Sequence, residues 1–365
     1  MRVLGIMSGT SSDGLDCCDV EINITSEYKF NFFIHDFATI PFSRSEKSFL
    51  LSVRDQENEF SNLSTNITEL FISKIEKFAN NPKFDIIACH GHTVKHIDKI
   101  LSIQLIDEKL LYHKFNTPII YNFRSNDIKY GGGGAPLMPF LDWVLFPDSS
   151  KEILTLNIGG ISNITYIPKG SNRQKVLGFD TGPGMSLVDK TTMKVFNESY
   201  DIDGKYSSQG KVDYELLERL MENKYVNKFP PKSTDIQDFG GKFLDEIFNQ
   251  NQNINSYDLI RTLIQFTIDS IHYNIINFVN LSSTNYELVY SGGGTDHPIV
   301  LETFKKRKIN IKSISEYGIE SSIKEALLIA LLGVCKILNL NSNMPSVTGA
   351  KTYCVLGDIY DGKNS

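Results

Sequence analysis

Residues 176–189 constrain the fold of this chain more than any other stretch, because they place an acidic residue between a predicted strand and a predicted helix. Residues 176–179 are typical of a strand end, and residues 186–197 are typical of a helix. The Gly-Pro-Gly of residues 182–184 is expected to end the strand, because glycine frees the backbone and proline removes a hydrogen-bond donor. Asp180 is therefore predicted at the carboxyl end of a strand, where open α/β sheets bind ligands.

Two roles fit Asp180 at that position. Its carboxylate could act as a general base, while the amides of the following turn donate hydrogen bonds to a phosphate. Alternatively, Asp180 could simply cap the turn. Both interpretations stay open on this stretch alone.

The chain has 365 residues, which is more than one hydrophobic core commonly holds and predicts two domains. A net charge of −6 without a long basic run argues against nucleic acid as the main partner. This balance does not exclude a phosphate ligand, because backbone amides and Mg²⁺ can neutralise its charge.

Five cysteines are an odd number without metal-like pairing, which is typical of reduced thiols in a cytoplasmic protein. No targeting segment is recognised, because the apolar residues 3–7 run directly into a polar turn. The longest apolar stretch, residues 326–335, is far below the roughly 20 residues that cross a bilayer. We expect a soluble cytoplasmic protein without a membrane partner.

The chain opens with a predicted hairpin, in which strands 2–7 and 15–24 flank the turn Ser-Gly-Thr-Ser-Ser-Asp-Gly. The hydroxyls and amides of this turn could wrap a terminal phosphate, and Asp13 or Asp16 could hold Mg²⁺ through water. It is not a Walker loop, because Gly-Lys-Ser/Thr is absent. A plain polar hairpin turn is the alternative.

The same design of strand, polar Gly/Ser turn and strand returns at residues 153–167, an offset of about 150 residues. The second turn contains Asn157, Gly159 and Gly160. This repetition predicts an internally duplicated fold in which each half presents a polar turn.

Residues 84–89 are predicted as a strand that leads into three histidines within seven residues, at positions 90, 92 and 96. A zinc site is disfavoured, because a glycine interrupts the segment. We instead expect a polar strand end facing a cleft, with His90 and Thr93 offering hydrogen bonds to a neutral, hydroxyl-rich ligand.

Another predicted strand, residues 119–124, ends in Arg124, whose guanidinium could bind an anion through two hydrogen bonds. Four glycines follow at 131–134 and cost folding entropy, so they need a reason. The glycines could allow the backbone to approach a ligand closely, or they could form a hinge. A domain linker with a surface arginine is the alternative.

The second half of the chain adds two candidate features. A predicted strand at 287–290 runs into Gly292, Gly293 and Gly294, whose bare backbone could lie against a ring or a phosphate. Glu325 fits a capping box with Ser322, and it could instead be a carboxylate at a helix start that points into the cleft. The isoleucine stripe of residues 257–278 is interpreted as core.

Six segments occur in an order that resembles the anhydro-N-acetylmuramic acid kinase family. They are MSGTSSDGLD at 7–16, GGGAPL at 132–137, NIGG at 157–160, FDTGPG at 179–184, PPKST at 230–234 and PSVTGA at 345–350. The resemblance implies a two-domain α/β fold of the sugar kinase, Hsp70 and actin superfamily, an actin-like ATPase fold with ATP in the interdomain cleft. We expect an N-terminal domain over 1–138, to which 345–365 could return, and a C-terminal domain over 139–344.

The resemblance also implies the reaction, in which the enzyme uses ATP and Mg²⁺ to open the 1,6-anhydro ring of the sugar and phosphorylate O6. It implies a homodimer, Asp180 as the base, and Arg124 and Glu325 as residues that position the sugar. The positions implied for the nucleotide are Gly9, Thr10, Ser11, Ser12, Asp13, Gly14, Asp16, Asn157, Gly159, Gly160, Gly182, Gly184, Gly292, Gly293 and Gly294, with Asp13 and Asp16 nearest the Mg²⁺.

Several positions depart from the family pattern. Asn122 stands where Asp is usual, His92 where Gln is usual, Met185 where Asn is usual, and Thr-Asp-His at 295–297 where Ala-His-Asn is usual. Asn122, His92 and Met185 leave open a related kinase with a different sugar substrate. A nucleotide-binding regulator or ATPase that acts on no sugar is a further alternative of another class.

Overall fold

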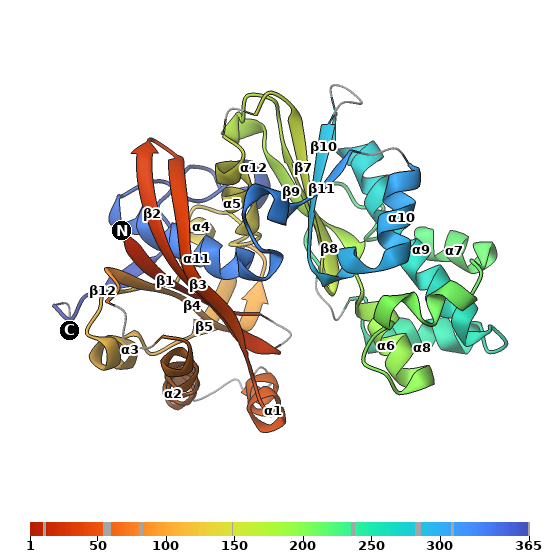
Figure 1. Ribbon diagram of the computed structural model, residues 1–365, viewed down its shortest axis with the longest axis horizontal. Helices are drawn as coiled ribbons and strands as arrows, with labels where there is room; N and C mark the ends of the chain where they lie inside the picture. Colours follow the sequence, from red (N-terminus) through yellow and green to blue (C-terminus); the bar gives the residue numbers. More distant parts are fainter. Residues whose placement is uncertain are drawn as a thin grey trace. The chain divides into compact units, whose positions relative to one another are not determined.

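The computed structural model describes residues 1–9, 12–53, 60–79, 83–147, 149–234, 238–281, 286–307 and 310–363. The chain divides into two compact units, one formed by 1–147 together with 319–365 and the other by 148–318 (Figure 1). Each unit contains its own mixed sheet, so the α/β class with two units is confirmed.

The first unit is built on a seven-stranded sheet of order β12-β6-β4-β1-β2-β3, with β5 paired to β4. Its strands are β1 (Arg2–Ser8), β2 (Gly14–Ser26), β3 (Lys29–Pro41), β4 (Ile86–Ile97), β5 (Leu101–Leu105), β6 (Ile119–Tyr121) and β12 (Asp358–Tyr360). Its helices are α1 (Arg44–Ser52), α2 (Phe60–Phe78), α3 (Glu108–Phe115), α4 (Ser125–Lys129), α5 (Met138–Leu145), α11 (Lys324–Ile337) and α12 (Pro345–Thr348).

The central strand β1 contacts different helices through its two faces, because successive side chains of a strand point to opposite sides. Leu4 and Ile6 belong to the core that includes Ile67 and Phe71 of α2. Gly5 lies on the other face, where an added Cβ would be 2.1 Å from the backbone oxygen of Ala326 in α11. The missing side chain of Gly5 therefore lets the first turns of α11 lie directly on the sheet.

A buried ion pair joins α11 to α5. Lys324 Nζ lies 2.9 Å from Asp142 Oδ1, and both side chains are almost fully buried. The division at 147/148 and 318/319 differs from the expected 138/139 and 344/345, because α5 and α11 pack together in the first unit.

The second unit contains a five-stranded sheet of order β11-β10-β7-β8-β9. Its strands are β7 (Glu152–Ile158), β8 (Ile161–Ile167), β9 (Leu177–Pro183), β10 (Tyr286–Ser291) and β11 (Ile311–Ser313). Its helices are α6 (Ser186–Phe196), α7 (Tyr214–Met221), α8 (Gly241–Gln250), α9 (Ser256–Phe278) and α10 (Pro298–Lys306), with a 3₁₀ turn η5 at Gly293–Asp296. Since β10 is parallel to β7, and β8 is antiparallel to both β7 and β9, the carboxyl ends of β7, β9 and β10 share one edge.

Most of the predicted elements are observed. The two hairpins, β1–β2 and β7–β8, confirm the repeated design, and the isoleucine stripe of α9 is buried in the second core. Residues 45–80, whose sequence pattern is typical of a helix, form α1 and α2, and residues 54–59 and 80 lie outside the described part of the chain.

The prediction that β9 ends before Gly182 is wrong. The strand continues to Pro183, which pairs with Ile161, and the register with β8 shifts between Ser162 and Asn163. β9 is the edge strand of this sheet, and Pro183 is its last residue, so the missing amide of proline breaks no ladder. Asp180 therefore lies inside the strand rather than at its end.

The capping box, one of the two interpretations of Glu325, is not observed. The helix α11 begins at Lys324, and its N-cap is Ile323, whose side chain accepts no hydrogen bond. Glu325 stands in the first turn of α11 and has no capping role there. None of the described helices is long and apolar enough to span a membrane.

Candidate functional site

The predicted phosphate loop is the tip of the β1–β2 hairpin. Ser12 has a left-handed backbone, with a φ of 53°, and its amide donates to Gly9 O at 3.1 Å. Its hydroxyl is buried, and within the described residues it has no hydrogen-bond partner. Such a group is costly unless a ligand satisfies it, so this turn fits a phosphate. Thr10 and Ser11, two further residues of the predicted loop, lie outside the described residues.

The two acidic residues of this loop have different surroundings. Asp13 is exposed and forms an ion pair with Lys47 of α1. Asp16, on β2, accepts a hydrogen bond from Thr39, and burial raises the pKa of its carboxyl group. In the described part of the chain, no group of three or more His, Cys, Asp or Glu side chains is placed to hold a metal ion.

Arg124 lies at the centre of a second group of polar residues, which come from β4 and from the segment after β6. Its Nε donates to His90 Nε2 at 3.0 Å, and its Nη1 donates to Gly134 O at 2.8 Å. His90 Nδ1 is 3.2 Å from Gly91 O, and a carbonyl can only accept, so His90 is neutral with its proton on Nδ1. Burial and the Arg124 charge lower the pKa of His90 to about 3.

His90 is therefore better described as a support for Arg124 than as a ligand contact. It is buried, and both of its ring nitrogens are occupied by protein groups. Thr93 stands further along β4 and accepts from Gln104 at 3.4 Å. The predicted hydrogen bond from His90 to a hydroxyl-rich ligand does not match this structure.

The glycine run at 131–134 is shaped by a buried carboxylate, which sequence reasoning missed. Asp127 Oδ2 accepts from Gly134 N at 2.8 Å, and its Oδ1 accepts from Asn343 and Thr348, each at 2.9 Å. A Cβ on Gly132 would lie 2.2 Å from Asp127 Oδ2. The structure thus explains these glycines by their packing around Asp127, and this packing presents Gly134 O to Arg124.

Glu325 completes the group in the first unit. Burial and the charge of Asp16 raise the pKa of its carboxyl group, while Arg124 and Lys324 act in the opposite direction. The charges of Asp16 and Arg124 thus both act on Glu325, although the three residues come from β2, the segment after β6 and α11.

Two departures from the family pattern have structural roles here. Asn122 donates to Asp358 of β12 at 2.6 Å and accepts from Ser125. His92 is fully buried, and its Nε2 lies 3.1 Å from Leu50 O. Neither contact involves Arg124 or Glu325.

In the second unit, the predicted nucleotide residues gather at the shared carboxyl edge of β7, β9 and β10. A Cβ on Gly292 would lie 2.5 Å from Ile158 O, and one on Gly294 would lie 2.5 Å from Ile158 Cγ2. Asn157 Oδ1 accepts from Ser291 at 3.3 Å. Gly293 has open space around its Cα, so at this turn a ligand could approach the backbone.

The backbone amides that follow β9 were predicted to donate hydrogen bonds to a phosphate, but they donate to the protein itself. Gly184 and Ser186 donate to Gly160 O at 3.0 and 3.2 Å, and Met185 donates to Gly159 O at 2.8 Å. A Cβ on Gly184 would lie 2.2 Å from Gly159 O, so this glycine is needed for the turn to pack on the β7–β8 hairpin. These amides are therefore occupied within the protein, which is a correction to the predicted phosphate donors.

Asp180 is held by a loop fifty residues further along the chain. Its Oδ2 accepts from Ser233 Oγ at 3.0 Å and from Thr234 N at 2.9 Å. Within the described residues, no donor reaches Oδ1. Its main chain is fixed as well, since Tyr225 Oη donates to Asp180 O at 3.0 Å. The carboxylate is thus oriented through one oxygen, which leaves the other oxygen for a substrate.

The electrostatics of Asp180 suit a base near neutral pH. Burial raises its pKa to about 6, although the two hydrogen bonds and the charge of Lys232 lower it. A base is most effective when its pKa lies near the working pH. The PPKST segment of the sequence was recognised as a motif, but nothing in its spacing showed that Ser233 and Thr234 contact Asp180.

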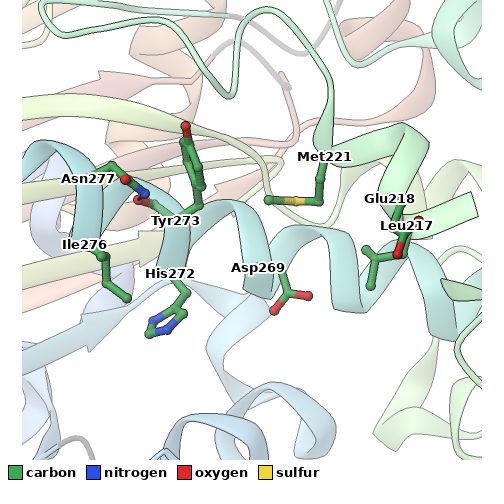
Figure 2. A pocket seen from close by; sticks show the side chains of 8 residues that line it. All are labelled: Leu217, Glu218, Met221, Asp269, His272, Tyr273, Ile276 and Asn277. Carbon is green, nitrogen blue, oxygen red and sulfur yellow. Dashed lines mark hydrogen bonds between the residues drawn. The ribbon is translucent and has the colours of Figure 1, made fainter. Parts of the chain in front are cut away.

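A separate hollow of about 410 Å³ lies between α7 and α9 (Figure 2). Figure 2 shows Asp269 and His272 on one side of α9 and Tyr273 on the opposite side. Ligand sites combine an enclosed cavity with convergent polar groups, and these side chains diverge. None of the residues predicted for the site lines this hollow.

Comparisons with known proteins agree with the motifs. A family model described as anhydro-N-acetylmuramic acid kinase matches residues 1–362. The anhydro-N-acetylmuramic acid kinase of Clostridioides difficile is 36% identical, over 98% of each chain. That of Bacillus thuringiensis subsp. konkukian is 32% identical, over 98% of this chain and 99% of its own. Among solved structures, component A of (R)-2-hydroxyglutaryl-CoA dehydratase from Acidaminococcus fermentans covers 91% of this chain and 96% of its own at 10% identity, with a TM-score of 0.44.

Proposed function

Because this chain belongs to the anhydro-N-acetylmuramic acid kinase family, we propose that it is an ATP-dependent kinase of anhydro-N-acetylmuramic acid. The overall reaction consumes the anhydro sugar, ATP and water, and it yields N-acetylmuramic acid 6-phosphate and ADP during cell-wall recycling. Both the family match and the relatives cover nearly the whole chain.

The observation that carries the proposal is the orientation of Asp180. One carboxylate oxygen is held by Ser233 and Thr234, and its pKa of about 6 leaves most of the group ionised at pH 7. In the proposed reaction the free oxygen takes a proton from the water that attacks C1. The C1–O6 bond breaks, O6 forms a bond to the γ-phosphorus, and the bond between that phosphorus and ADP breaks.

In this proposal the other site residues bind and orient the nucleotide and the sugar. The buried hydroxyl of Ser12 fits a phosphate oxygen, and the open backbone at Gly293 fits the nucleotide. Arg124, fixed by His90 and Gly134 O, would donate to the sugar, and Glu325 would accept from its hydroxyl groups. Positioning and charge neutralisation supply most of the catalysis in phosphoryl transfer, so no covalent intermediate with the protein is required.

We propose Mg²⁺ as the metal, with Asp13 and Asp16 as its nearest protein groups, each through water. Mg²⁺ keeps several waters and commonly takes only one or two carboxylates besides the phosphates, so a large protein ligand set is not needed. When bound, the ion neutralises charge on the phosphates.

The test is an assay of the pure protein with Mg-ATP, with and without the anhydro sugar, in which the sugar phosphate and ADP are both measured. We expect both products, and only when the sugar is present. ADP release that does not depend on the sugar would instead identify an ATPase, and phosphorylation of a different amino sugar would identify a related kinase.

Asp180→Asn tests the assigned base. The change keeps the size of the side chain and removes its ability to accept a proton, so turnover should fall by ~10²–10⁴-fold or more. ATP affinity, measured by calorimetry, should stay near the wild-type value, because the proposed contact is to the water. A large loss of ATP affinity would contradict this assignment.

We further propose a homodimer in the cytoplasm, as the family resemblance implies. Light scattering of the purified protein in solution measures the mass directly, and a value near the 41.2 kDa of one chain would contradict the dimer.

A further inference from the structure

Lys232 is a buried cation beside the base that the proposed mechanism does not use. Its side chain is 5% exposed, and its Nζ donates to Tyr225 O at 3.1 Å and to Val226 O at 3.0 Å. The rings of Phe179, Tyr225 and Phe278 surround the ammonium, with centroids 5.0 to 5.7 Å away. Among the described residues, it forms no ion pair.

The same residues connect Lys232 to Asp180 on several sides. Lys232 O accepts from Asp180 N at 3.4 Å, and the next two residues hold Asp180 Oδ2. Tyr225 accepts from Lys232 through its carbonyl and donates to Asp180 O through its hydroxyl. Lys232 thus secures both segments that orient the carboxylate, the loop at 232–234 and the turn at 225–226.

A buried ammonium without a carboxylate partner is costly, and an apolar side chain of similar length would fit among three rings. The free-energy cost of burying this ammonium therefore indicates that the positive charge of Lys232 itself has a role. Burial lowers the pKa of Lys232 to about 8, so the side chain is still mostly protonated at pH 7. Its charge stabilises the ionised form of Asp180.

We propose that Lys232 is a positioning residue for the base, which holds the loop at 232–234 against Asp180 and keeps that carboxylate ionised. This inference rests on the proposed role of Asp180 as the base. Lys232 does not touch the substrate in this proposal, and it acts entirely through Asp180.

The other charged and titratable groups around this pair do not replace it. Tyr225 has its pKa raised by burial, so it stays neutral. The charge of Lys228 lowers the pKa of Lys232. The charge of Asp238 helps to raise the pKa of Tyr225, and its carboxylate accepts a hydrogen bond from the Thr234 hydroxyl at 2.6 Å. Lys232 is the one cation among the causes that shift the pKa of Asp180.

The experiment compares pH profiles of kcat/KM for the full-length wild type, Lys232→Met and Lys232→Arg. Losing the charge should raise the pKa of the base, so the acidic limb should move to higher pH by about 1 unit in Lys232→Met. If the pKa of Asp180 rises from about 6 in the wild type to about 7 in Lys232→Met, the variant should lose about fivefold more kcat/KM, relative to the wild type, at pH 6 than at pH 8.5. Lys232→Arg keeps the charge, so its acidic limb should stay near the wild-type position.

Lys306→Met is the matched control, because it removes the same charge from an exposed position on α10. Its profile should superimpose on that of the wild type. Thermal unfolding of each variant shows whether it is folded, and Lys232→Gln, which keeps a donor for the two carbonyls, replaces the methionine variant if that one does not fold.

Two outcomes overturn the inference in distinguishable ways. If Lys232→Met loses stability or kcat uniformly and keeps the wild-type acidic limb, Lys232 has only a structural role. If Asp180→Asn retains wild-type turnover, the base itself is misassigned, and the proposed function fails together with this inference.

Discussion

At the scale of single residues, the charged side chains of the proposed site are each held by hydrogen bonds to only some of their polar atoms. Asp180 is fixed through Oδ2, and Arg124 is fixed through Nε and Nη1. In both cases an uncharged neighbour holds the group without neutralising its charge, since the Ser233 hydroxyl donates to Asp180 and the neutral His90 ring accepts from Arg124. The functional atoms can therefore be aimed at a substrate while keeping their charge.

Ser233→Ala tests this arrangement. The variant loses one of the two hydrogen bonds that favour the ionised form of Asp180, so the pKa of this carboxyl group should rise above about 6. A base with a raised pKa is protonated at higher pH, so kcat/KM should fall most below pH 7 and recover toward pH 9.

The loss at pH 6 should be about 3- to 10-fold, which corresponds to roughly 1 kcal/mol for one hydrogen bond. Ser233→Thr keeps the hydroxyl and is the control. Equal losses for the alanine variant at pH 6 and pH 9 would show that Ser233 does not tune the base.

At the scale of elements, glycines decide how closely helices and turns approach the sheets. Gly5 allows α11 to lie on β1, and Gly184 allows the turn before α6 to lie on the β7–β8 hairpin. Both contacts lie close to a proposed site residue, because Glu325 is in the first turn of α11 and Asp180 is three residues before Pro183 in β9. A glycine in the middle of a strand gives no sign of which helix will cover it.

Gly5→Ala should destabilise the protein by about 1–3 kcal/mol, because the new methyl group meets the backbone of Ala326 and α11 must move away. The midpoint of urea unfolding should fall accordingly. The KM for the sugar should rise, because Glu325 moves with the helix.

Gly241→Ala is the control for Gly5→Ala, since an added Cβ there meets no atom within 4 Å. Its stability should change by less than about 1 kcal/mol. An unchanged urea midpoint for Gly5→Ala would contradict the close packing of α11 on β1.

At the scale of the whole molecule, the two units differ in how the chain builds them. The second unit is one continuous segment, 148–318, with its own sheet and core. The first unit combines 1–147 with 319–365, which supply the helix α11 on its central strands and the edge strand β12. The first unit therefore needs the end of the chain, whereas the second does not.

Two fragments test this difference. Residues 148–318 should fold alone, with cooperative urea unfolding and a native circular dichroism spectrum. Residues 1–147 should not unfold cooperatively, because this fragment lacks α11. The Gly5 face of β1 is then uncovered, and the buried Asp142 has lost its ion pair with Lys324. Cooperative unfolding of 1–147 by itself would contradict the division of the chain.

Local sequence patterns were sufficient to locate the two hairpins and the apolar helix α9, and they singled out Asp180, Arg124 and Ser12 as candidate site residues. Alternation, helical spacing and glycine-rich turns act over a few neighbouring residues, so they can be recognised without the fold. The sequence motifs were also sufficient for the family, because their order and spacing together are specific.

The fold was needed for every relation between distant segments: Ser233 and Thr234 on Asp180, His90 under Arg124, Asn343 and Thr348 on Asp127, and Lys324 with Asp142. It also showed that the amides after β9 are already bonded and that β9 continues through Asp180. Such relations depend on which strand edges and helix faces meet in space, and a linear pattern contains no term for contacts between residues that are tens to hundreds of positions apart.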